Sequence, residues 1–324
     1  MRCVQRQESA RNLVVCIDDT SDQYGPNNTN VVKLFAKIDL ESTQPEQFAY
    51  YSSVVGTRSE SLHPLGRMQR AVYDKFDVAA ARNMEENVKD AYGWLAQIYR
   101  EGDQIYLFGF SRGAYQVRVL AGVIHEVGLA KGVTTEDQTG KAYCCYEAIR
   151  QGKPKAMQTA REFKKTSCWQ DVRVHFVGVW DTIGPMKGDV LLPVSSSAAH
   201  TCHFRHALAL DELRVKFMPE YFHEMNSLRN LSTYRREIID AKEVWFAGSH
   251  SDMWFRNAGH VSLLWMRREA TANGLVLKPA DVVWLPDDLD SGVTNSMTSI
   301  WRPFEYLPIK HQVSFSGTGE DARR

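Results

Sequence analysis

A serine, an aspartate and a histidine follow one another along this chain in an order that suits ester hydrolysis. Ser111 lies in a Gly-x-Ser-x-Gly motif over residues 109–113, and Asp181 and His250 come later in the chain. A serine hydroxyl becomes a nucleophile when a histidine removes its proton and a carboxylate orients that histidine. We therefore predict a triad in which Ser111 is the nucleophile, His250 the base and Asp181 the orienting acid, acting through an acyl-enzyme.

Each member of this triad closely follows an apolar run that is typical of a buried strand. The runs cover residues 104–110, 172–180 and 243–247. An apolar segment from Ala114 to about Val127 predicts a helix after Ser111. A strand, a turn flanked by glycines and a helix form the context in which this motif becomes a nucleophile elbow. There the Ser111 hydroxyl projects beyond the sheet, and the helix N-terminus faces any oxyanion that forms.

The rest of the chain continues the alternation of apolar strands and helical patterns. Further strands are predicted at 13–17 and 48–55, and helices at 31–38, 72–100, 141–165 with a break at 152–154, 204–217 and 261–272. This alternation predicts an α/β fold that is α/β-hydrolase-like, with a mostly parallel sheet and helices on both faces. Polar residues follow the strands at one edge of that sheet, where such proteins bind ligands, so we expect a single active site there.

The predicted catalytic domain covers residues 12–275. Within it, residues 184–203 contain scattered Gly, Pro and Ser without a clear period, which indicates a long loop near the site. Residues 276–324 are rich in Pro, Asp, Ser and Trp. They predict a C-terminal extension that packs on the domain or is partly disordered.

Two backbone N–H groups are expected to form the oxyanion hole. One backbone N–H comes from the residue after the nucleophile, here Arg112. The other comes from the loop after the first strand, which makes the backbone of Asp19 or Thr20 the candidate donor. Asp18 is expected to organise this loop rather than to react. The Arg112 side chain either pairs with Asp18 or binds an anionic head group, and the sequence leaves both open.

His206 is an alternative base. It lies in a pattern that predicts a helix over 205–217, and a helix aims a side chain less freely than the loop that carries His250. We therefore favour His250. The His-x-x-His pair at His200 and His203 has no carboxylate at helical spacing, so no metal site is predicted, and the triad chemistry requires no cofactor.

Composition disfavours several other classes of protein. Of the 324 residues, 44% are hydrophobic and 24% are charged, and the formal net charge of zero disfavours a nucleic-acid partner. No apolar run approaches the roughly 18 residues of a membrane span, and residues 1–11 lack the pattern of a signal peptide. The six cysteines form no Cys-x-x-Cys pair. We expect a cytoplasmic protein with reduced thiols and at most transient contact with a membrane surface; its oligomeric state is open.

The segments around these residues resemble a known family. Together they are similar to the catalytic domain of the type VI secretion phospholipase effector-like family, a group of α/β-hydrolases with many uncharacterised fungal members. The matching segments cover roughly residues 12 to 270 and are Leu13–Thr20, Thr29–Val31, Gly56–Thr57, Gly109–Ala114, Val179–Thr182, Arg205–Glu212 and Trp245–Asp252. The resemblance implies lipase or phospholipase chemistry, in which Ser111 attacks a lipid ester or another small ester.

Two departures from the family pattern leave a second hypothesis open. The family usually has Asp-Gly-Thr where this chain has Asp18, Asp19 and Thr20, which places a carboxylate beside the developing negative charge. The family also continues into a glycine-rich stretch after the histidine, where this chain has the bulkier residues 253–257. The alternative is a catalytically degenerate α/β-hydrolase-like scaffold that binds a lipid or a partner protein. A nucleotide-binding fold is disfavoured, because no Gly-x-Gly-x-x-Gly follows the first strand.

Overall fold

The sheet at the centre of the fold is wholly parallel. The computed structural model describes residues 10–18, 28–53, 84–132, 136–184, 201–221, 240–255, 257–281 and 293–297. Within these residues, six strands are ordered β2-β1-β3-β4-β5-β6, and all neighbours are parallel. The strands are β1 (Asn12–Asp18), β2 (Gln47–Ser53), β3 (Gln104–Phe110), β4 (Val174–Trp180), β5 (Thr201–Ala209) and β6 (Asp240–Phe246). The predicted α/β fold is confirmed.

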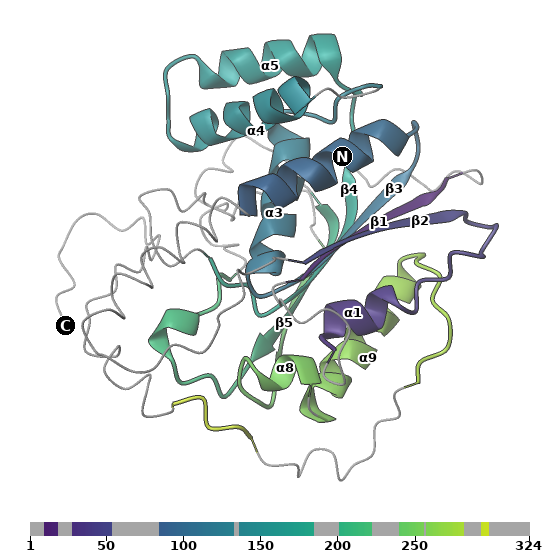
Figure 1. The fold of residues 1–324 in the computed structure, drawn as a ribbon, viewed down its shortest axis with the longest axis vertical. Helices are drawn as coiled ribbons and strands as arrows, with labels where there is room; N and C mark the ends of the chain where they lie inside the picture. Colours follow the sequence, from purple (N-terminus) through teal and green to yellow (C-terminus); the bar gives the residue numbers. More distant parts are fainter. Residues whose placement is uncertain are drawn as a thin grey trace, which may run out of the picture.

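Helices cover both faces of the sheet (Figure 1). One face carries α3 (Arg112–Glu126), with α4 (Glu136–Arg150) and α5 (Ala156–Ser167) outside it and a helical segment over 84–98. The other face carries α1 (Asn30–Phe35) and α9 (Asn257–Ala272), which follows the short α8 (Asp252–Phe255). A single turn of 3-10 helix, η1 (Val215–Phe217), follows β5. No helix in the described part of the chain is both long and apolar enough to cross a membrane.

The burial of β1 on both faces of the sheet explains why its sequence is apolar without interruption. Leu13, Val15 and Ile17 lie in the core beneath α3, whereas Val14 and Cys16 lie in the core beneath α1 and α9. Successive side chains of a strand point to opposite faces, so a strand covered on both sides needs apolar residues throughout. β1 also lies between β2 and β3 in the sheet. The strand order therefore reverses at β1, because β2 is added on one side of it and β3 to β6 are added on the other. The carboxyl ends of β1 and β3 therefore form the switch point at which α/β sheets bind ligands.

The predicted helix over 204–217 is wrong in its first half. Residues 204–209 belong to β5, which is buried along nearly its whole length, and η1 is the only helical turn in the rest of that range. A strand covered on both faces has no polar alternation, and its apolar residues here happen to recur at helical spacing. The predicted loop over 184–203 is wrong at residues 201–203, which form the start of β5. Residues 185–200 lie outside the described part, as do residues 72–83 of the helix predicted at 72–100.

Two described pieces of the predicted C-terminal extension contact the domain. The Lys278 backbone N–H donates to the Lys37 carbonyl, and Thr294 hydrogen-bonds Asp252 through both its backbone and its hydroxyl. The domain boundary at residue 275 stays a prediction.

Among the described cysteines, the expectation of reduced thiols is wrong for Cys202. Cys202 is disulfide-bonded, whereas Cys16, Cys144, Cys145 and Cys168 are free. The spacing of cysteines along a chain does not reveal which of them the fold brings together, so this bond was not foreseeable.

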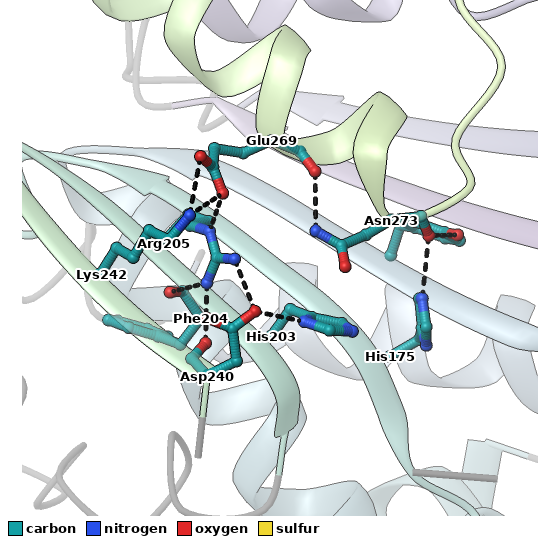
Figure 2. A network of polar contacts seen from close by, with 9 residues as sticks. His175, His203, Phe204, Arg205, Asp240, Lys242, Glu269 and Asn273 are labelled. Atoms are coloured by element: carbon teal, nitrogen blue, oxygen red, sulfur yellow. Dashed lines mark hydrogen bonds and ion pairs between the residues drawn. The ribbon is translucent and has the colours of Figure 1, made fainter. Parts of the chain in front are cut away.

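A polar network around the buried Arg205 joins α9 to the sheet near the amino ends of β5 and β6 (Figure 2). The Arg205 side chain, 2% exposed, donates to the carboxylates of Glu269 on α9 and Asp240 on β6. Lys242 binds Glu269 from a more exposed position, and His203 contacts Asp240. Burial opposes ionisation of Glu269, but hydrogen bonds from Lys242 and Arg205 outweigh it and lower its pKa.

We expect Glu269→Ala to lower the free energy of unfolding by about 3 kcal/mol, because it removes one partner of a buried guanidinium. Lys242→Ala is the matched control and should cost at most about 1 kcal/mol, since that lysine is half-exposed. Urea unfolding at pH 7 measures both. The stabilisation by Glu269 should be lost as the pH falls through its lowered pKa. Equal effects of the two substitutions on the free energy of unfolding would show that the ion pair between Glu269 and the buried Arg205 does not stabilise the fold.

Candidate active site

Ser111 lies on a sharp turn between β3 and α3. Its backbone has φ 55° and ψ −121°, a conformation that residues with side chains rarely adopt. Strain of this kind is expected at a nucleophile elbow. The Ser111 N–H donates to the Trp180 carbonyl, and the Ser111 carbonyl accepts from the Ile183 N–H. Both sides of the elbow are thereby joined to the residues around the end of β4.

The two glycines of the motif are required by close backbone contacts. A Cβ on Gly113 would lie 2.2 Å from the Ile17 carbonyl oxygen, and one on Gly109 would lie 2.6 Å from the Gly113 carbonyl oxygen. Real Cβ atoms do not approach backbone this closely. Gly113 therefore lets the first turn of α3 pack directly on the end of β1, and Gly109 lets the same turn pack against the end of β3. Together they place Ser111 at the switch point.

The three predicted residues meet in one hydrogen-bonded chain. Ser111 Oγ lies 3.1 Å from His250 Nε2, and His250 Nδ1 lies 2.5 Å from Asp181 Oδ2. All three residues are buried. The His250 ring stacks on Phe110 and makes an edge-to-face contact with Phe217. Because an ionised carboxylate only accepts, Nδ1 carries the proton and Nε2 is left to accept from the serine.

Asp181 is fixed by the backbone of β5. Its own backbone has φ 43°, in the left-handed region, and its N–H donates to the Ala207 carbonyl. The carboxylate accepts from the Ala209 N–H at Oδ1 and faces His250 at Oδ2. One oxygen therefore anchors the side chain while the other orients the histidine.

Two carboxylates that the sequence did not indicate support the turn that carries His250. Glu212 accepts from the His250 N–H and is itself held by Arg214. Asp252 accepts from the backbone and hydroxyl of Ser249 and from Thr294. Glu212 contacts a residue far along the chain, and Asp252 contacts both its own turn and the distant Thr294. No spacing in the sequence indicates such contacts, so these two residues could be noticed only because they lie in segments that match the family.

His206, the alternative base, faces a different group. It lies on β5 and is fully buried, with Nδ1 2.9 Å from Glu243 Oε1 and Nε2 3.2 Å from the Thr182 N–H nitrogen. Burial lowers the pKa of His206, although the hydrogen bond to Glu243 opposes this effect. His250, not His206, is the histidine that the structure places on Ser111 Oγ.

The predicted oxyanion residues are partly described. Arg112 is the first residue of α3, so its backbone N–H lies at a helix N-terminus beside Ser111. Asp18 is buried and accepts from the hydroxyls of Thr29 and Tyr51, so it joins the ends of β1 and β2 to the start of α1. Asp19 and Thr20 lie outside the described residues.

One departure from the family pattern has a structural explanation. Residues 253–255 of the bulky stretch lie in α8, and the Met253 side chain is buried in the core beneath α1 and α9. Its carbonyl accepts from Asn30 Nδ2, which also donates to the Gly259 carbonyl. Met253 therefore packs away from Ser111 and stabilises the turn that carries the histidine.

Comparisons with known proteins agree with the resemblance noted in the sequence. Residues 11–269 match the family described as "T6SS, Phospholipase effector Tle1-like, catalytic domain". The chain is 33% identical over 247 residues to "Uncharacterized protein YEL023C" of Saccharomyces cerevisiae, an alignment that covers 72% of this chain and 36% of that protein. The chain thus spans about a third of the length of this curated relative.

Two solved structures are similar at low sequence identity. One is an uncharacterized protein from Pseudomonas aeruginosa, with a TM-score of 0.42 and 15% identity, covering 86% of this chain and 48% of that one. The other is the Tle1 effector bound to the VgrG spike of the type 6 secretion system, with a TM-score of 0.35 and 13% identity, covering 77% of this chain and 51% of that one.

Proposed function

The chain belongs to the T6SS phospholipase effector Tle1-like catalytic domain family, and from this premise we propose that it hydrolyses the carboxylic ester of a lipid through a serine acyl-enzyme. The observation that carries the proposal is the continuous hydrogen-bonded chain from Ser111 through His250 to Asp181. The strained backbone of Ser111 at the start of α3 supports it, because this geometry aims the hydroxyl at a substrate beyond the sheet.

The proposed reaction assigns one role to each residue. His250 Nε2 takes the proton as Ser111 Oγ attacks the ester carbonyl, and Asp181 stabilises the imidazolium that forms. The Arg112 N–H and the N-terminus of α3 stabilise the oxyanion. His250 then returns the proton to the departing alcohol. Water, activated by the same histidine, releases the acyl group from Ser111.

Exposed aliphatic side chains near the triad support a lipid as the substrate. The segment after β5 brings Phe217 against His250, and four of its other side chains are exposed. These are Leu210, Leu213, Val215 and Met218. Apolar side chains on the segment that contacts His250 suit the acyl chain of a lipid, and they are compatible with transient contact with a membrane surface.

Labelling with a fluorophosphonate tests the proposal. The probe should attach to Ser111 in the folded protein, and the modified peptide should be identified by mass spectrometry. We expect no labelling of Ser111→Ala and much slower labelling of His250→Ala, because the histidine activates the nucleophile. A folded parent protein that remains unlabelled would instead favour the degenerate scaffold that the departures from the family pattern leave open.

A further inference from the structure

His206 lies on β5 and contacts both the turn after β4 and the neighbouring strand β6. Three residues of β5 contact the turn that contains Asp181: Ala207 and Ala209 through their backbones, and His206 through its ring. The ring accepts from the Thr182 N–H at Nε2, and it faces Glu243 of β6 at Nδ1. His206 is 0% exposed, so water does not compete for either nitrogen.

The partners of His206 determine its tautomer. A backbone N–H only donates, so Nε2 must be unprotonated to face Thr182. The proton therefore lies on Nδ1, where it is donated to Glu243. Three charged groups act on the ring: Glu243 and Asp181 favour its protonation, whereas Arg118 disfavours it. Burial is the largest influence and keeps the pKa of His206 below its ordinary value, so the neutral form that accepts from Thr182 is maintained.

The other side of Thr182 is also held. Its carbonyl accepts from the Glu220 N–H, and the carbonyls of Glu220 and Tyr221 accept from the Arg118 guanidinium. Arg118 is buried in α3, and burial lowers its pKa to about 10, so it remains charged at neutral pH. The N–H of Thr182 is thus held by His206, and its carbonyl is held by Glu220, whose own carbonyl is bound by Arg118 of α3.

The Thr182 N–H belongs to the peptide bond that directly follows Asp181, so its direction depends on the backbone conformation of Asp181. We infer that His206 is a positioning residue, which with Glu243 holds this peptide so that Asp181 keeps its left-handed conformation and its carboxylate faces His250. The inference rests on the proposed function in one respect only, that the Asp181–His250 contact serves catalysis. The histidine supplies the acceptor for the Thr182 N–H at Nε2.

Two substitutions at this position separate positioning from general stability. His206→Leu removes the acceptor, whereas the amide oxygen of His206→Gln can still accept from Thr182. We expect His206→Leu to lower kcat for a soluble ester by about 10²-fold, the cost of a small misplacement of a catalytic group. KM should change by less than about threefold, because ester binding does not use Asp181. His206→Gln should recover most of the lost kcat.

His175→Leu is the matched control. That histidine also lies in a strand of the sheet and contacts a backbone carbonyl, that of Asn273 (Figure 2). It is near the amino end of β4, however, whereas Ser111 follows the carboxyl end of the parallel strand β3. The His175→Leu substitution should leave kcat unchanged. If His206→Leu does not fold, the comparison of His206→Gln with Glu243→Met, which removes the acceptor of the His206 proton, provides the same test. Glu243→Met should then lower kcat without a change in KM.

Crystal structures of the parent and the variants give a readout that does not depend on turnover. In His206→Leu, or in Glu243→Met, we expect Asp181 Oδ2 and His250 Nδ1 to separate beyond about 3.5 Å, the limit of a hydrogen bond. An unchanged Asp181–His250 contact, or a kcat equal to that of the parent in a folded His206→Leu, would overturn the inference. If the parent hydrolyses no ester, the proposed function fails, and the separation of the two atoms still decides the role of His206.

Discussion

Ser111→Ala and His250→Ala are each expected to lower kcat for ester hydrolysis by about 10⁴- to 10⁶-fold, and the double substitution should cost no more than either alone. The two side chains share one 3.1 Å hydrogen bond and act in a single proton transfer. Once either is absent the other has nothing to activate, so their effects do not add. Any residual rate then comes from the oxyanion donors and substrate binding.

The measurement requires a soluble ester and a titrated concentration of active sites, so that a trace of contaminating esterase is not mistaken for residual activity.

Asp181→Asn should lower kcat by about 10⁴-fold, because an asparagine cannot stabilise the imidazolium and favours the wrong tautomer of His250. Ser167→Ala is the control, since that hydroxyl contacts Thr166 at the end of α5. Additive losses in the double variant would show that Ser111 and His250 do not act as one unit.

The elbow and its strand could be predicted because their signals are local. Residues 104–110 form a buried strand as predicted, and α3 begins at Arg112, directly after the serine. Asp181 and His250 could be singled out because parallel strands end at the same edge, which makes the residue after a strand a candidate for the site. Their contact with Ser111, however, depends on the order of strands in the sheet, which no local pattern contains.

The role of His206 could not be predicted for a physical reason. β5 is covered by helices on one side and by α9 on the other, so its apolar residues lack the alternation that distinguishes a strand from a helix. Placing His206 in a helix gave its ring the wrong direction. Its partner Glu243 lies on β6, beside β5, and no spacing within the sequence relates two residues that pair across parallel strands.

Gly113→Ala is expected to abolish the stable fold, although it adds a single methyl group at a helical position. The added Cβ would lie 2.2 Å from the Ile17 carbonyl oxygen and 3.1 Å from the Asp18 carbonyl carbon. Neither neighbour is a flexible side chain, because both belong to the backbone of β1, which is paired with β2 on one side and β3 on the other. The helix would have to leave the sheet to relieve the contact.

We expect this clash to cost more than about 4 kcal/mol, a large part of the 5–15 kcal/mol that stabilises a typical domain. Gly140→Ala in α4 is the matched control, because a Cβ there would meet nothing within 4 Å. That substitution should raise the free energy of unfolding by about 0.5–1 kcal/mol, since alanine favours a helix over glycine. The two changes are chemically identical, so opposite shifts of the thermal midpoint isolate the environment of Gly113. A Gly113→Ala protein that melts with the parent would show that α3 does not rest on β1, and the elbow would then lack the support that places Ser111 at the switch point.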